Sequence, residues 1–137
     1  MNDHTIALVR ESFDLIEPIA PQVGAMFYAH LFEADPSLQR LVKGDTALQV
    51  AQLMQTVALA VARLDEPDLL IPVLLELGRR HAGQGVNAAR HETILAALLR
   101  TLHQALGAAY NAEVEEAWVD VYGALSSKIT QLAATPV

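Results

Sequence analysis

Hydrophobic residues recur at intervals of three and four along most of the chain, which is the spacing that places them on one side of an α-helix. Pro18 and Pro21 separate the first two such segments, and Pro36 begins a short helical turn after the second. The pattern predicts helices over about residues 3–17, 18–32, 36–41, 46–64, 67–81, 87–107 and 111–132. No segment has the alternation expected of a strand, so the sequence predicts an all-α fold.

Composition agrees with this interpretation. The chain has 137 residues, of which 53% are hydrophobic, only 5% are aromatic and 18% are charged, compared with roughly 25% charged residues in ordinary globular chains. We expect a single domain over residues 1–137, because one core suffices for a chain of this length. The absence of cysteine excludes disulfides, thiolate metal sites and cysteine nucleophiles.

The net charge of −7 argues against a nucleic acid or an anionic membrane as the main partner, because both attract basic surfaces. Charged residues at positions 3, 10 and 11 interrupt the first dozen residues, so no secretion signal is predicted. The longest uncharged run, residues 46–62, is short for a membrane span and contains three glutamines. We therefore expect a cytoplasmic protein without membrane insertion.

The most informative stretch ends the helix predicted over residues 67–81. Leu74 and Leu77 precede His81 by seven and four residues, so the three side chains share one helical face, which the leucines predict to be buried. Gly83 and Gly85 then favour the end of the helix. A histidine in such a position is more often a core residue held by a hydrogen bond than a cofactor ligand, and this stretch alone leaves both open.

The other motifs in the sequence give weaker evidence for a functional site. The segment 83–88 matches a dinucleotide-binding fingerprint as a string, but it follows a predicted helix where that motif requires a strand. None of the five histidines lies three to five positions from another, so no local zinc site is predicted; they are His4, His30, His81, His91 and His103. Acidic residues cluster near the start of the last predicted helix, which is typical of a solvated helix start; they are Glu113, Glu115, Glu116 and Asp120.

Two polar side chains, Tyr28 and Gln49, lie on otherwise apolar helices. Taken alone, Tyr28 is explained as a core tyrosine with its hydroxyl at the surface, and Gln49 as a rim residue. Together with His81 they form the set that a flat iron macrocycle requires, namely an imidazole on one face, an apolar slot and hydrogen-bond donors on the other face.

Four groups of residues carry a resemblance to a known family. They are Phe27-Tyr28-Ala-His-Leu-Phe32 followed by Pro36, Gln49 with Leu53 and Met54, Leu77-Gly-Arg-Arg-His81 with Gly85-Val86, and Ala117-Trp118 with Tyr122-Gly123. The tyrosine, glutamine and histidine are 21 and 32 residues apart. In these features, and over nearly its whole length, the chain resembles the single-domain bacterial haemoglobins of the Vitreoscilla type and the globin part of the flavohaemoglobins.

The resemblance implies a globin fold of about seven helices around a pocket for haem b, iron protoporphyrin IX. His81 would be the iron ligand, and Tyr28, Gln49 and Leu53 would face the bound gas. The other haem contacts implied are Val42, Leu53, Arg80, Val86, Ile94, Leu98 and Tyr122. The implied function is reversible binding of oxygen, for transport or storage, with carbon monoxide and nitric oxide as further ligands, in a monomer or a homodimer.

Three positions depart from the family pattern. The family normally has a phenylalanine where this chain has Val42, a tyrosine where it has His91 and a glutamate where it has Ala133. No catalytic residue is predicted, and oxidation of nitric oxide would require a separate reductase as electron donor. The alternative interpretation is a globin-fold sensor or interaction module without haem, which Val42 favours.

Overall fold

The computed structural model describes residues 2–40, 46–83 and 88–134, and within them it contains six α-helices, three short 3-10 helices and no strand. This confirms the all-α prediction. The elements are α1 Asp3–Ile16, η1 Glu17–Ile19, α2 Ala20–Ala34, η2 Pro36–Arg40, α3 Thr46–Ala62, α4 Pro67–Gly83, α5 Ala88–Leu106, η3 Gly107–Ala109 and α6 Ala112–Ala134. None of these helices is both long and apolar enough to cross a membrane.

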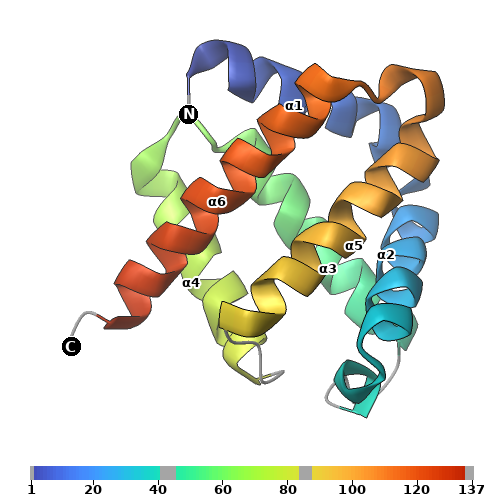
Figure 1. Ribbon diagram of the computed structural model, residues 1–137. Coiled ribbons are helices and arrows are strands. Elements are labelled where there is room, and N and C mark those ends of the chain that lie inside the picture. The colour runs from blue at the N-terminus through green and yellow to red at the C-terminus, as the bar shows by residue number, and fades with distance from the viewer. Residues whose placement is uncertain (1, 41–45, 84–87, 135–137) are drawn as a thin grey trace.

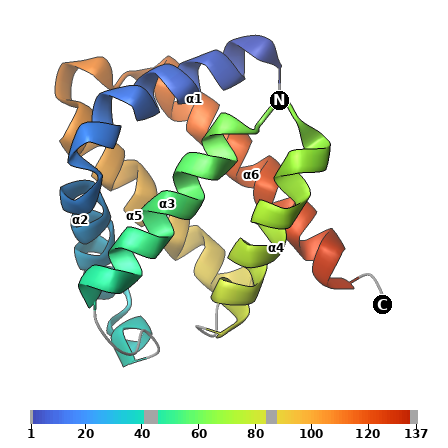
Figure 2. The ribbon, with the colours of Figure 1, turned by 180° about the vertical axis from the view of Figure 1, so that it is seen from behind.

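The helices form two layers. Helices α5 and α6 lie in front of α3 and α4 in Figure 1, and the reverse view in Figure 2 brings α3 and α4 to the front. Helix α1 crosses one end and packs on α6, while α2 packs on both α3 and α5. Helix α4 contacts α3 and α6, so the described helices enclose a common interior.

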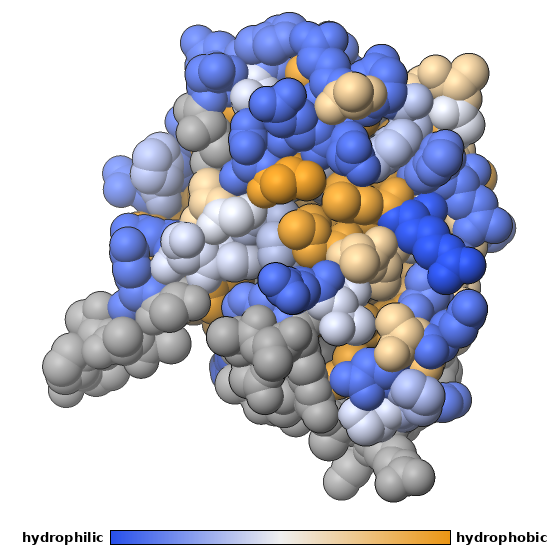
Figure 3. All heavy atoms as spheres, in the orientation of Figure 1, coloured by the Kyte–Doolittle hydropathy of each residue, from blue (hydrophilic) through white to orange (hydrophobic). Residues whose placement is uncertain are grey.

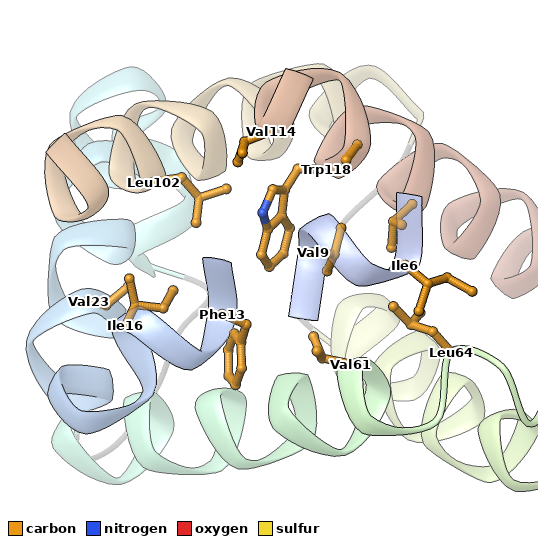
Figure 4. Packing of buried hydrophobic residues seen from close by; sticks show 12 residues of the cluster. Ile6, Val9, Phe13, Ile16, Val23, Val61, Leu64, Leu102, Val114 and Trp118 are labelled. Atoms are coloured by element: carbon orange, nitrogen blue, oxygen red, sulfur yellow. The ribbon is translucent and has the colours of Figure 1, made fainter. Parts of the chain in front are cut away.

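The interior at the α1 end is the largest hydrophobic cluster. The stripe that predicted the first helix, Ile6, Val9, Phe13 and Ile16, is buried there against residues of α3, α5 and α6. Figure 4 shows Trp118 of α6 pointing into this cluster. Its indole Nε1 donates a hydrogen bond of 2.8 Å to Ser12 Oγ, so the one polar atom of the ring is satisfied inside the core.

Hydrogen bonds from Arg10 link α1 to the end of α3. Its Nε donates to the carbonyl oxygen of Val61 at 3.1 Å, and its Nη2 donates to Ala62 O and to Asp65 Oδ1, both at 2.8 Å. The last carbonyls of a helix have no partner within the helix, and the guanidinium supplies one. The hydrogen bond from Arg10 also lowers the pKa of the Asp65 carboxyl below its ordinary value.

Gly24 sets the distance between α2 and α3. A Cβ added at Gly24 would lie 2.6 Å from Val50 Cγ1 and 3.0 Å from Met54 Cγ, which is closer than side chains can pack. Only glycine therefore allows the two helices to approach as they do. This contact fixes the segment of α3 that carries Gln49, Val50 and Leu53.

Replacing Gly24 with alanine should lower the free energy of unfolding. Overpacking typically costs about 1–3 kcal/mol, which exceeds the gain in helix propensity of up to about 1 kcal/mol. Gly123 provides a matched control, because a Cβ at this exposed position of α6 meets no atom within 4 Å, and Gly123→Ala should stabilise the protein. Urea unfolding followed by circular dichroism measures both. Equal stabilisation by the two substitutions would show that α2 and α3 do not depend on close approach at Gly24.

Candidate functional site

An apolar cavity of about 180 Å³ lies in the interior, with walls from α1, α2, α3, α5 and α6. Four residues predicted to contact a cofactor line it: Leu53 on α3, Ile94 and Leu98 on α5, and Tyr122 on α6. Apart from a few hydroxyl groups and the thioether of Met54, the lining side chains are hydrocarbon or aromatic. Figure 3 shows apolar side chains gathered at the surface between α5 and α6. The four predicted residues therefore belong to one apolar space.

Tyr28 lies beside this cavity in a second hydrophobic cluster. Its side chain is only 4% exposed, and its ring packs on Phe27 and Phe32 with centroid distances of 5.6 and 5.5 Å. Among the described residues, α2 contributes Val23 and Phe27 to the cavity wall, and Tyr28 packs next to that wall. The same cluster contains Ile94 and has Leu53 and Tyr122 packed against it. Tyr28 is therefore in the layer of side chains that supports the cavity.

Gln49 lies on α3 one turn before Leu53. Its side chain is half-buried, and its neighbour Val50 is buried in the cluster of Tyr28. Residues four apart on a helix lie on one face, so Gln49 occupies the same side of α3 as Leu53, Val57 and Ala60, which line the cavity.

Tyr122 joins the cavity wall to the start of α5. Its hydroxyl donates to the carbonyl oxygen of His91 at 3.4 Å, and the two rings meet edge to face with centroids 6.5 Å apart. Burial raises the pKa of the Tyr122 hydroxyl above its ordinary value, because it disfavours the phenolate. The histidine that departs from the family pattern thus packs on a residue of the cavity.

Helix α4 carries the predicted ligand position. Leu70 and Leu74 of the predicted apolar stripe are buried against residues of α3 and α6, and Leu74 is 1% exposed. Residue 81 belongs to the last turn of α4, which ends at Gly83 as the glycines predicted. The side chains of Arg80, His81 and Ala133, and the whole of Val42 and Val86, lie outside the described part of the chain.

The sequence analysis did not predict most of the cavity lining, and Thr101 and Trp118 are two polar examples. Thr101 and Trp118 line the cavity, and each uses its polar hydrogen elsewhere, since Thr101 Oγ1 donates to Ala97 O at 2.7 Å and Trp118 bonds Ser12. Gly24 was also missed, although an isolated glycine within an apolar helical pattern is a signal of close packing. Which residues face an internal space depends on how helices pack, and periodicity in one helix does not contain that information.

Comparison with known proteins adds independent findings. A family model described as Globin matches residues 25–129, a range that includes the positions from Tyr28 to Tyr122. Neuroglobin from Danio rerio is 29% identical over 138 aligned residues, which cover 90% of this chain and 87% of that protein. Flavohemoproteins from Chromobacterium violaceum and Bacillus cereus are 26% and 25% identical, and the alignments cover 94% and 98% of this chain. The chain spans only about a third of the flavohemoproteins, 33% and 34% of their lengths.

Proposed function

Because the chain belongs to the globin family, we propose that it is a haem protein that binds oxygen reversibly, with carbon monoxide and nitric oxide as further ligands. One observation carries the proposal: Leu53, Ile94, Leu98 and Tyr122 come from three helices and line one apolar cavity. The resemblance read from the sequence implies the same four residues as cofactor contacts. Haem b is largely an apolar disc, and a slot with hydrocarbon walls is the environment that retains it.

We assign His81 as the iron ligand. It follows the buried Leu74 by seven residues, which is nearly two turns of α4. When bound, haem would supply an iron that His81 would hold and that could bind a diatomic gas. The chain supplies the slot and the ligand, and Arg80, Val42 and Val86 are proposed as further contacts at its edge.

Tyr28 and Gln49 are proposed to act on the gas side. Ferrous haem would supply the oxygen chemistry, and the hydrogen-bond donors of Tyr28 and Gln49 would stabilise negative charge on that side of the site. Tyr28 is fixed by Phe27 and Phe32, whereas Gln49 is half-buried on the neighbouring helix. We assign no catalytic residue to the described chain. Oxidation of nitric oxide would need electrons from a separate reductase, and we propose this only as an activity of the two proteins together.

The alternative is a globin-fold module that does not bind haem, and a haemin titration of the purified full chain distinguishes the two. We expect a sharp Soret band that saturates at one haem per chain. A spectrum identical to that of free haemin would instead support the haem-free module. The single-domain bacterial type, the cytoplasmic location and the monomeric or homodimeric state stay predictions from the sequence.

Substituting a residue of the cavity wall should speed haem loss, whereas the same substitution at a surface residue should not. Leu98→Asp places a charge in the apolar cavity and should speed haem loss to an apo-acceptor, because an unpaired carboxylate in hydrocarbon is costly. Leu59→Asp, at a position of α3 that is 40% exposed, is the matched control. Circular dichroism checks that both variants keep their helices. Haem loss at the wild-type rate from Leu98→Asp would contradict the proposed location.

A further inference from the structure

Helix α3 is exposed along one side and carries no charge. None of its seventeen residues is charged, although the chain as a whole has a net charge of −7. Two of its large apolar side chains are exposed, since Leu48 is 55% and Leu59 is 40% accessible to solvent. The outer face of a surface helix ordinarily carries charged and polar residues. The outer face of α3 therefore has the composition of a surface that another molecule covers.

The exposed side chains of α3 form one continuous ridge. They follow one another at intervals of four, three and four residues, which places them on a single stripe of the helix. We call this stripe the α3 ridge and define it by Leu48, Gln52, Gln55 and Leu59, which are all exposed. Figure 2 shows α3 at the front of the molecule from this side, with α2 beside it. The ridge projects outward from that face.

A groove runs alongside the ridge, where α3 meets the segment from the end of α1 to the start of α2. Its volume is about 310 Å³. Its apolar lining consists of Phe13, Ala20, Pro21, Ala51, Met54 and Ala58. The polar lining residues are Glu17 and Gln55, and both are exposed. Because Gln55 also belongs to the α3 ridge, the ridge and the groove share an edge.

We propose that this face is the interface of a two-fold symmetric dimer, in which the α3 ridge of each chain lies in the groove of the other. A two-fold dimer uses the same patch twice, so a ridge beside a groove can be complementary to a rotated copy of itself. Charged residues near the axis would meet their own copies and repel, and the ridge contains none. The Glu17 carboxylate can accept hydrogen bonds from the glutamine amides of the other chain's ridge.

The charge distribution favours a second copy over other partners. Two chains with a net charge of −7 each repel one another, and the repulsion is smallest when uncharged faces meet and the acidic residues stay outside. A basic partner would find only one carboxylate, Glu17, among the ridge and groove residues. Helices that lie on anionic lipid carry Lys or Arg on their polar face, and α3 has neither.

The dimensions of the face predict a weak dimer. The seventeen residues of α3 are about 25 Å long, and α3 together with the neighbouring α2 is about 20 Å wide. The face is thus about 500 Å² per chain, or about 1,000 Å² for the pair, which is near the lower limit of specific interfaces. We therefore expect a reversible dimer with a dissociation constant of about 1–100 µM.

Sedimentation equilibrium of the purified full chain, with and without added haem, measures the association. We expect the average mass to rise from one chain to two through that range of concentration. Leu48→Glu should raise the dissociation constant at least about 100-fold, because it brings two carboxylates into each dimer interface. Leu75→Glu is the matched control, because Leu75 is 52% exposed and lies on α4, outside the ridge and the groove. A wild-type chain that stays monomeric up to about 1 mM, or equal weakening by both substitutions, would overturn the proposal.

Single cysteines test how the two chains face each other. The chain contains no cysteine, so the new thiol of Gln55→Cys can form a disulfide only with a second copy. Gln55 lies where the ridge and the groove meet, and residues near a two-fold axis face their own copies. Mild oxidation should cross-link Gln55→Cys at concentrations at which Leu75→Cys stays uncross-linked. Preferential cross-linking of Leu75→Cys would show that the chains meet at another face, which overturns the proposal.

The dimer and the haem site can be tested separately. Leu59 belongs to the ridge, so Leu59→Asp should separate the chains and still lose haem at the wild-type rate. Leu98→Asp should lose haem faster and still form the dimer. Association of a chain that forms no Soret band would remove the haem site and keep the dimer interface. A Soret band in a chain that is monomeric at every concentration would do the reverse.

Discussion

Replacing His81 with alanine should abolish stoichiometric haem binding. An apolar slot alone holds haem only by burial, whereas the bond from imidazole to iron fixes both its position and its coordination. We therefore expect the Soret titration of His81→Ala to lose its sharp end point at one haem per chain. Added free imidazole should restore a ligated spectrum in part, which a purely structural role of His81 would not allow.

Three other histidines serve as controls, because the structure places them away from the cavity wall. His4 Nε2 lies 2.7 Å from Glu113 Oε1, and His30 Nε2 lies 2.8 Å from Gln104 Oε1. His103 stacks on Tyr110 with ring centroids 5.0 Å apart. Alanine at any of the three should leave the haem stoichiometry unchanged. His91 is no control because it packs on Tyr122 in the cavity wall. Full haem retention with an unchanged spectrum in His81→Ala would refute the assignment.

The helices could be predicted because their signals are local. The stripe of α1 and the leucines of α4 each lie within one segment, and the structure buries both sets. The family match over residues 25–129 supports the globin fold predicted from the resemblance. Most helix boundaries differ from the predicted ones by one or two residues. The start of the second helix is an example, because Pro18 was the predicted first residue, yet Pro18 lies in η1 and α2 begins at Ala20. Proline has no N–H to donate, so two prolines three residues apart favour a tight turn before the α-helix.

The site could be predicted only in part, because a cavity arises between helices. Leu53, Ile94, Leu98 and Tyr122 were found through the resemblance, and they line one space. The approach at Gly24 and the position of Trp118 in the cavity wall depend on the positions of several helices at once. Nothing in the spacing along a single helix reports how closely a second helix approaches it. Tyr28 illustrates the difference, since its helix was predicted but its packing between Phe27 and Phe32 was not.

Replacing Tyr28 with phenylalanine should speed oxygen dissociation by about 10- to 150-fold. A hydrogen bond to a charged acceptor contributes roughly 1.5–3 kcal/mol, and each ~1.4 kcal/mol corresponds to a factor of ten. The ring of Tyr28 is 4% exposed and held by two aromatic neighbours, so its donor would be presented with little loss of conformational entropy. Phenylalanine keeps that packing and removes only the hydroxyl. Carbon monoxide gains little charge on binding and should respond much less.

Gln49→Leu should have a smaller effect on oxygen dissociation than Tyr28→Phe. The side chain of Gln49 is longer and only half-buried, so holding its amide in place costs more conformational entropy. If both residues donate to one ligand, the effects of the two substitutions should not add in the double variant. Stopped-flow dissociation rates for oxygen and carbon monoxide, measured on the wild type and the three variants, test both statements. A larger effect from Gln49→Leu, or equal responses of the two gases to Tyr28→Phe, would show that the Tyr28 hydroxyl is not the main donor.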